Sequence, residues 1–409
     1  MKQQIVLFCQ IIKNVLRDER DEVVQENIEW DNMVRFAKEQ NVYPLFVEEA
    51  VKYSTYITRL KSSQEMQEAL MVVSSQVRRT ETFLQLYKAF LEADIHPLVL
   101  KGLVCRGLYG KYCDHRPSGD EDILIQPAEY WKAKEVLLTN GYVTEIKDET
   151  EEQLENLQEV SFYHATEGLH IELHLNVMGR EDMARSKMSD CFKNVFDDYR
   201  EIEIDGMMIR TMSHQNHFLY LILHAFKHFM GSGFGIRQML DILLYQENYG
   251  EQIDMQHLYQ TLKEFRAAKF LSDIVSIGNR YFGFNLQTIQ EANCPDELLE
   301  DMLSGGVFGG KTQAHIAAAR VTTFATGDYL KTKSTNRFMI FWRAIFPDRA
   351  YLLRNAPQLE TKPWLLPIEW VKRWGRFVKR SIHNDGDLVN ESLSISQKRI
   401  ELLKKYDLL

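Results

Sequence analysis

Residues 97–127 read PLVLKGLVCRGLYGKYCDHRPSGDEDILIQP, and this stretch holds the clearest structural pattern of the chain. The apolar run 98–100 predicts a short buried strand, and Gly102 then turns the chain into a predicted helix at 103–109. After a polar turn, residues 120–125 read DEDILI and predict a second strand. The stretch is therefore a strand–helix–strand unit.

The second strand carries two acidic residues on one face. Successive strand residues point to opposite faces, so Asp120 and Asp122 lie on the same side, about 7 Å apart. Two buried carboxylates with no Lys or Arg in the strand are costly, and a divalent cation such as Mg²⁺ removes that cost. The turn at Gly102 presents backbone N–H groups at a helix N-terminus, which suits a phosphate. The unit thus combines a candidate metal site with a candidate phosphate cradle.

This stretch resembles the DNA polymerase β-type nucleotidyltransferase superfamily, whose small members often read Gly-Ser-x-Ala-Arg-Gly before an Asp-x-Asp strand. Here residues 102–107 read GLVCRG, so both glycines and Arg106 match while Leu103 replaces the serine. A lysine before the first glycine, as at Lys101, resembles a bacterial branch of uncharacterised nucleotidyltransferases. The superfamily motif covers residues 97–177, and the resemblance to that branch extends over most of the chain.

The resemblance implies metal-dependent transfer of a nucleotide. Asp120 and Asp122 would hold Mg²⁺ or Mn²⁺ at the triphosphate of a nucleoside triphosphate. Lys101, Gly102 and Arg106 would contact phosphate oxygens, Lys as a point charge and Arg through two hydrogen bonds at once. Without the serine hydroxyl, the phosphate contacts fall to the backbone N–H groups and these two cationic side chains.

A third acidic residue follows in a predicted hairpin. The runs 161–164 and 169–175 alternate in polarity and are separated by Thr-Glu-Gly. In the second run His170, Glu172 and His174 fall on one face. Glu172 matches the third carboxylate of the superfamily, which ligates the metal or takes the proton from the attacking hydroxyl.

A predicted helix at 213–230 carries a histidine stripe. His217, His224 and His228 share a face because they are seven and four positions apart. Three interpretations stay open: hydrogen-bonded core histidines, a zinc site on His224 and His228, or a face that borders the nucleotide or acceptor pocket together with His174.

Two arginines have both a binding and a structural interpretation. Arg116 lies in the turn before the Asp-x-Asp strand, where it either neutralises phosphate charge or forms a structural ion pair. On a predicted helix starting at Ile236, Arg237 and Asp241 are four positions apart, which favours an ion pair on the helix face.

Residues 305–312, GGVFGGKT, match the P-loop pattern letter for letter. The preceding residues 296–303 are acidic and helix-like rather than a buried strand, and no βαβ pattern surrounds the match. We therefore interpret this segment as a glycine-rich connection between helices. The alternatives are a mobile loop that closes over the active site and a phosphotransferase that uses Lys311 and Thr312.

The remaining sequence is predominantly helical. Amphipathic stretches are predicted at 5–15, 30–41, 64–91, 257–282 and 295–303. An aromatic and basic segment at 363–380 has the spacing of a core-facing or subunit-packing stripe, and a membrane-surface helix is the alternative.

The composition limits the class of protein. The chain has 409 residues, a net charge of −9 and five scattered cysteines without a Cys-x-x-Cys pair. Such cysteine use is typical of the reducing cytoplasm, and no run approaches the ~20 apolar residues of a membrane span. The negative net charge disfavours a long nucleic-acid acceptor.

We therefore predict an α+β fold. A small mixed β-sheet nucleotidyltransferase core at 96–180 is flanked by a helical N-terminal region at 1–95 and a mostly helical C-terminal region at 181–409. The predicted enzyme moves a nucleoside monophosphate from a nucleoside triphosphate to a small-molecule or protein acceptor that the sequence does not identify. Leu103 keeps one alternative open: a non-catalytic nucleotide-binding or regulatory protein with the same fold.

Overall fold

The chain divides into two compact units. One comprises Met1–Ala225 with Ile236–Pro295, and the other Phe226–Gly235 with Asp296–Leu409. The computed structural model describes residues 2–19, 28–53, 56, 64–145, 150, 154, 157–179, 183–231, 233–305, 349, 352, 356, 359, 362–372 and 388–408.

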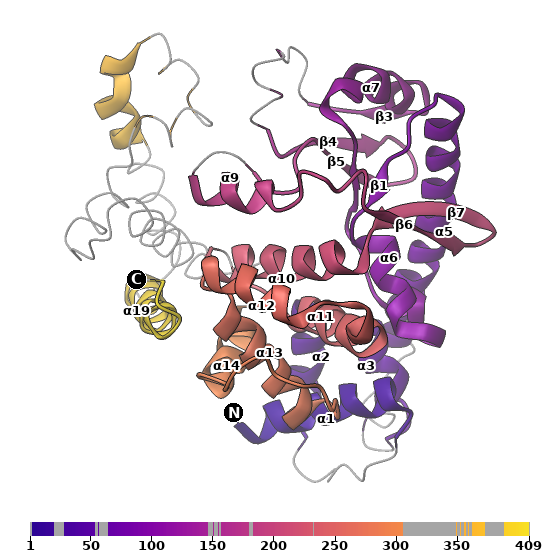
Figure 1. Cartoon of the computed structure of the whole chain (residues 1–409). Coiled ribbons are helices and arrows are strands. Elements are labelled where there is room, and N and C mark those ends of the chain that lie inside the picture. The colour runs from indigo at the N-terminus through magenta and orange to yellow at the C-terminus, as the bar shows by residue number, and fades with distance from the viewer. Residues whose placement is uncertain are drawn as a thin grey trace. The chain divides into compact units, whose positions relative to one another are not determined.

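The first unit contains a seven-stranded mixed sheet in the order β3-β4-β5-β2-β1-β7-β6 (Figure 1). The strands are β1 Leu98–Val99, β2 Glu121–Leu124, β3 Tyr142–Val143, β4 Glu159–His164, β5 His170–His174, β6 Tyr199–Ile204 and β7 Met207–Met212. The pairs β2–β5 and β1–β7 are parallel, and the other neighbours are antiparallel. The predicted α+β class with a mixed sheet is confirmed. The sheet also includes β6 and β7, which lie after residue 180.

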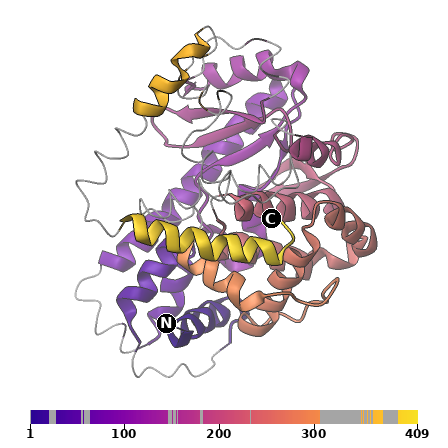
Figure 2. The same ribbon diagram turned by 90° about the vertical axis from the view of Figure 1, so that its left-hand side faces the viewer.

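Two helices cover one face of this sheet, α5 (Gln64–Glu92) and α7 (Tyr130–Thr139). Phe90 of α5 belongs to the same buried cluster as Ile123 of β2 and Leu173 of β5. Figures 1 and 2 show the purple helix α5 lying against the strands. Each such side chain contributes about 1.5–3 kcal/mol when fully buried. Because side chains alternate along a strand, the neighbours of Ile123 and Leu173 in sequence lie on the opposite face.

The other helices of the first unit precede, connect or follow the strands along the chain. They are α1 Lys2–Arg17, α2 Trp30–Glu39, α3 Tyr43–Ala50, α6 Gly102–Arg106, the 3₁₀ segment η1 Gly107–His115, α9 Met183–Asp190, α10 His214–Met230, α11 Ile236–Tyr249, α12 Met255–Glu264 and α13 Ala268–Tyr281. The region predicted at 257–282 is thus two helices. The break falls at Arg266, whose φ of +61° is a left-handed value that ends a helix.

The second unit contains α14 (Pro295–Gly305) and α19 (Leu388–Lys405), together with the end of α10. Arg399 of α19 donates to Asp301 of α14 and to the carbonyl oxygen of Phe229. These bonds tie the last turn of α10 to the C-terminal helix.

Two sequence motifs fall partly outside the described residues. Of the P-loop match, Gly305 ends α14, and residues 306–312 lie outside the described part of the chain. Of the aromatic and basic segment, residues 363–372 are described. There Trp370 packs against a small cluster that includes Leu352 and Leu359, whereas Trp364 is 68% exposed.

Candidate active site

The parallel pair β2–β5 brings the acidic residues together. Asp122 is paired in register with Glu172. Because side chains alternate along both strands, one face carries Asp120, Asp122, His170, Glu172 and His174. This is the face opposite α5 and α7. The sequence-predicted carboxylates therefore meet on one surface of the sheet.

Two groups of potential metal ligands lie on this face within the described part of the chain. One consists of Asp120, His170 and Glu172, and the other of Asp122, Glu172 and His174. In each group, one ligand atom from each residue lies within 4.8 Å of the others. Glu172 belongs to both groups. The face is thus a candidate acidic metal-binding cluster that also contains imidazole nitrogens.

Asp122 is fully buried and is neutralised by its own chain. Its Oδ1 lies 3.0 Å from the Lys101 Nζ and 3.0 Å from the His174 Nε2. Burial acts to raise the pKa of Asp122, but the Lys101 charge and the hydrogen bond from His174 outweigh it and hold the pKa well below its usual range. The buried Oδ2 receives no hydrogen bond from any described residue. The Lys101 Nζ also lies 3.2 Å from the His224 Nε2.

Glu172 and His174 both have shifted pKa values. Burial, reinforced by the charge of Asp122, raises the pKa of Glu172 to about 7, against the opposing effect of His174. Burial disfavours the charged form of His174, but its interactions with Asp122 and Glu172 raise its pKa to about 9. At neutral pH His174 is therefore a cation, and Glu172 is partly protonated. A divalent cation bound to Glu172 would displace that proton.

The side chain of Glu121 fills the Gly102 turn, and this was not predicted from the sequence. Gly102 has a φ of +41°, and a Cβ at this position would overlap the Oε2 of Glu121. This oxygen accepts the backbone N–H of Leu103 at 2.7 Å, while Arg106 donates to the Oε1 of Glu121, also at 2.7 Å. The groups expected to bind phosphate are thus engaged by a buried carboxylate. Their phosphate-binding roles stay predictions.

A second buried ion pair holds Arg116. Its guanidinium donates to both carboxylate oxygens of Asp241, at 2.7 and 2.6 Å, and the hydroxyl of Tyr109 also donates to Asp241. Arg237 instead donates to the carbonyl oxygen of Pro117. The structural interpretation of Arg116 therefore fits the contacts. The Arg116 pair takes the place of the expected Arg237–Asp241 pair and ties α11 to the turn before β2.

The histidines of the α10 stripe lie in different surroundings. His217 is buried beside the Thr211 hydroxyl, and burial lowers its pKa to about 3, so it is a neutral structural histidine. His224 contacts Lys101, whereas His228 belongs to the second unit. In the described residues, neither His224 nor His228 belongs to a group of potential metal ligands. The pocket roles predicted for His174, His224 and His228 stay predictions.

A family model described as an uncharacterised nucleotidyltransferase matches residues 26–283, more than half of the chain. The chain belongs to this nucleotidyltransferase family. The match includes the whole sheet and every residue of the acidic face. It confirms the resemblance to an uncharacterised nucleotidyltransferase branch, and the wider link to the polymerase β superfamily stays a prediction. No curated protein and no solved structure matches the chain.

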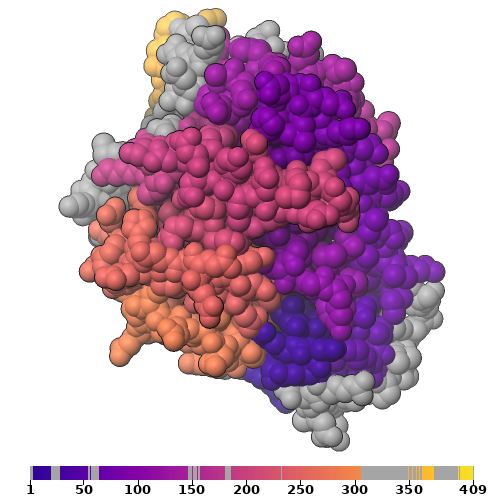
Figure 3. Space-filling model, turned by 45° about the vertical axis from the view of Figure 1, so that its right-hand side comes forward, coloured from indigo at the N-terminus to yellow at the C-terminus, as the bar shows by residue number. Residues whose placement is uncertain are grey.

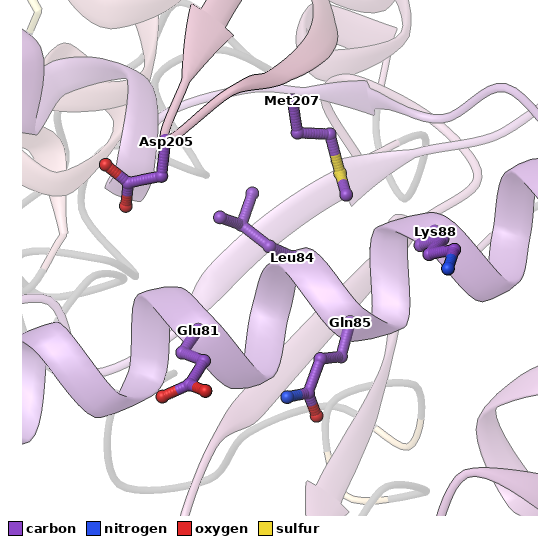
Figure 4. A pocket seen from close by; sticks show the side chains of 6 residues that line it. All are labelled: Glu81, Leu84, Gln85, Lys88, Asp205 and Met207. Atoms are coloured by element: carbon purple, nitrogen blue, oxygen red, sulfur yellow. The ribbon is translucent and has the colours of Figure 1, made fainter.

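The chain also has a pocket away from the acidic face, between α5 and the β6–β7 hairpin. Figure 3 shows the surface on which these two elements lie. It is lined by Glu81, Leu84, Gln85, Lys88, Asp205 and Met207. In Figure 4 the side chains of Leu84 and Met207 point into the gap, and those of Glu81 and Gln85 point away from the hairpin. None of the predicted site residues lines this pocket. In the described part of the chain, no helix combines the length and apolar character needed to cross a membrane.

Proposed function

We propose that this protein is a divalent-metal-dependent nucleotidyltransferase that moves a nucleoside monophosphate from a nucleoside triphosphate to an acceptor. The observation that carries the proposal is the parallel register of β2 and β5, which sets Asp122 opposite Glu172 on the face that also holds Asp120. Membership in a nucleotidyltransferase family supports the same chemistry.

The donor set fits a divalent cation. Asp122 has a buried Oδ2 that receives no hydrogen bond from the described residues, and Asp120 and Glu172 supply further carboxylate oxygens on the same face. A bound dication would neutralise triphosphate charge and stabilise the attacking and leaving oxygens. The protein itself contributes the cation of Lys101, which we assign to a phosphate oxygen. The acceptor oxygen forms a bond to the α-phosphorus, the bond to pyrophosphate breaks, and an acceptor hydroxyl releases its proton to solvent water.

The test is metal-dependent binding and turnover of the four ribonucleoside triphosphates. Calorimetry measures binding with Mg²⁺ or Mn²⁺, and a coupled assay measures pyrophosphate release. An Asp120→Asn/Asp122→Asn variant should lose metal-dependent binding, and its pyrophosphate release should fall at least about a hundredfold. Asp205→Asn is the matched control, because Asp205 has a left-handed φ of +48° that Asn also tolerates.

Two results would count against the proposal. Nucleotide binding that does not depend on the metal or on the two aspartates would place the site elsewhere. No binding of any of the four nucleotides would remove the transferase from consideration.

A second candidate function is a non-catalytic nucleotide-binding protein, and the position of Glu121 favours it. This carboxylate occupies the turn at which the superfamily binds phosphate, and it engages both the N–H of Leu103 and the guanidinium of Arg106. Metal-dependent nucleotide binding without pyrophosphate release, across an acceptor screen, would support this alternative. If Glu121 holds the triphosphate out of the turn, Glu121→Gln should raise the nucleotide affinity.

A further inference from the structure

His170 supplies a nitrogen donor at one end of the acidic face. Its Nε2 is buried and has no hydrogen-bond partner among the described residues. Its ring stacks on Tyr163 of β4, with the ring centroids 4.4 Å apart and an interplanar angle of 2°. A ligand atom of His170 lies within 4.8 Å of one from Asp120 and one from Glu172. The stacked ring is thus held beside two carboxylates.

At the other end of the face, Asp122 already has two partners. Its Oδ1 contacts the Lys101 ammonium and the His174 imidazole, both at 3.0 Å. The Nε2 of His174 is therefore engaged with Asp122 rather than free for a metal. The Lys101 ammonium beside the same oxygen also opposes the approach of a dication. A metal is therefore disfavoured in the group that includes His174.

The Oδ2 of Asp122 is a second, independent observation that points to a cation on this face. Asp122 is fully buried, its Oδ2 has no hydrogen-bond donor among the described residues, and it is paired in register with Glu172. A buried carboxylate oxygen without a partner is costly, and a dication held by Glu172 reduces that cost through its charge.

We propose that Asp120, His170 and Glu172 bind a first-row transition-metal dication in preference to Mg²⁺. The inference rests on the proposed metal-dependent transfer and specifies its metal. Mg²⁺ takes oxygen ligands in near-ideal octahedral geometry, whereas transition-metal dications accept imidazole nitrogen as well as carboxylate oxygen. His170 is thus the residue whose imidazole favours a transition-metal dication over Mg²⁺.

Mn²⁺ alone is the probe, added to the full-length protein without nucleotide. Free Mn²⁺ is counted by continuous-wave electron paramagnetic resonance, and pulsed measurements on the bound ion detect coupling to ¹⁴N of a coordinating imidazole. The wild type should show this nitrogen coupling. His170→Phe keeps a ring against Tyr163 but removes the donor, so the coupling should vanish and Mn²⁺ affinity should fall at least about tenfold. Mg²⁺ affinity, measured by competition, should change by less than about threefold.

His164→Phe on β4 is the matched control, because His164 lies outside both ligand groups in the described residues and should leave the nitrogen coupling intact. Circular dichroism establishes whether each variant folds, and His170→Gln replaces His170→Phe if the latter does not. Bound Mn²⁺ without nitrogen coupling in the wild type overturns the inference. So does coupling that survives in both His170 variants but disappears in His174→Gln, and so does a failure to bind Mn²⁺.

The outcomes separate this inference from the proposed function. Nitrogen-coordinated Mn²⁺ in a protein that releases no pyrophosphate supports the metal site and counts against the transferase. Pyrophosphate release with Mg²⁺, combined with oxygen-only coordination of Mn²⁺, supports the transferase and counts against the proposed nitrogen ligand.

Discussion

Replacing Lys101 by methionine tests how the charge of Asp122 is held inside the fold. The Lys101 side chain is 17% exposed and its Nζ lies 3.0 Å from the carboxylate of the fully buried Asp122. Removing one partner of a buried ion pair costs about 3–5 kcal/mol, because the other charge is left uncompensated. His174 still contacts the same oxygen at 3.0 Å, so we expect the lower end, about 3 kcal/mol.

The assay is urea unfolding of the metal-free protein, followed by far-ultraviolet circular dichroism. Lys111→Met is the matched control, because Lys111 and Asp18 form an ion pair 3.2 Å apart at the surface, where their side chains are 61% and 75% exposed. This control should leave the free energy of unfolding unchanged within error. Mn²⁺ should restore more stability to Lys101→Met than to the wild type, because a dication replaces the missing ammonium.

A loss below about 1 kcal/mol in Lys101→Met would refute the reasoning, because it would match a surface ion pair rather than a buried one. Equal stabilisation of both proteins by Mn²⁺ would show that the ammonium and the metal do not share the charge of Asp122.

Three further predictions concern the same region. Arg106→Met should lower the free energy of unfolding, measured in urea, by about 3–5 kcal/mol, because it leaves the buried Glu121 without its ion-pair partner. Adding Glu121→Met should recover most of that loss. No recovery in the double variant would contradict the ion-pair account. Gly102→Ala should sharply lower the melting temperature, because the added Cβ overlaps the Glu121 side chain. Gly119→Ala is the control, because a Cβ there has no atom within 4 Å. Equal melting temperatures of the two variants would rule out a close approach of Glu121 to Gly102. The pKa of His174 is raised from 6.5 to about 9, so its stabilising effect is complete below pH 6.5 and is lost as the pH rises through 9. Melting of the metal-free protein should show this fall between pH 6.5 and 9, and an unchanged fall in His174→Gln would assign it to another group.

The acidic face was predictable because it depends on local periodicity. Alternation along a strand is enough to put Asp120 beside Asp122, and it likewise groups His170 with Glu172. The same alternation places Glu121 on the opposite face, so the sequence also predicts that Glu121 does not belong to the metal cluster.

The partners of the cationic residues were not predictable from spacing. Arg106 meets Glu121, 15 positions away, and Arg116 meets Asp241, 125 positions away. Such pairs form only when the helices and the sheet pack, and no sequence period encodes them. Spacing of four on a helix favoured Arg237 for Asp241, but tertiary packing gave that carboxylate to Arg116.

One missed element did have a local signal. The runs YREIEI at 199–204 and MMIRTM at 207–212 flank Asp205-Gly206, a two-residue turn typical of a β-hairpin. The hairpin adds β6 and β7 to the edge of the sheet next to β1. The break at Arg266 had no comparable signal, because arginine is a good helix former and its residue type does not predict the left-handed φ of +61°.

The ammonium of Lys101 balances the buried charge of Asp122 without a metal ion. Many small metalloproteins stay unfolded until their ion arrives, because nothing else balances the ligand charges. Here the chain carries its own counter-ion for Asp122, so this charge does not require a metal during folding. A metal bound as proposed would then be added to the folded protein, and we expect a chelator to withdraw it without unfolding the chain.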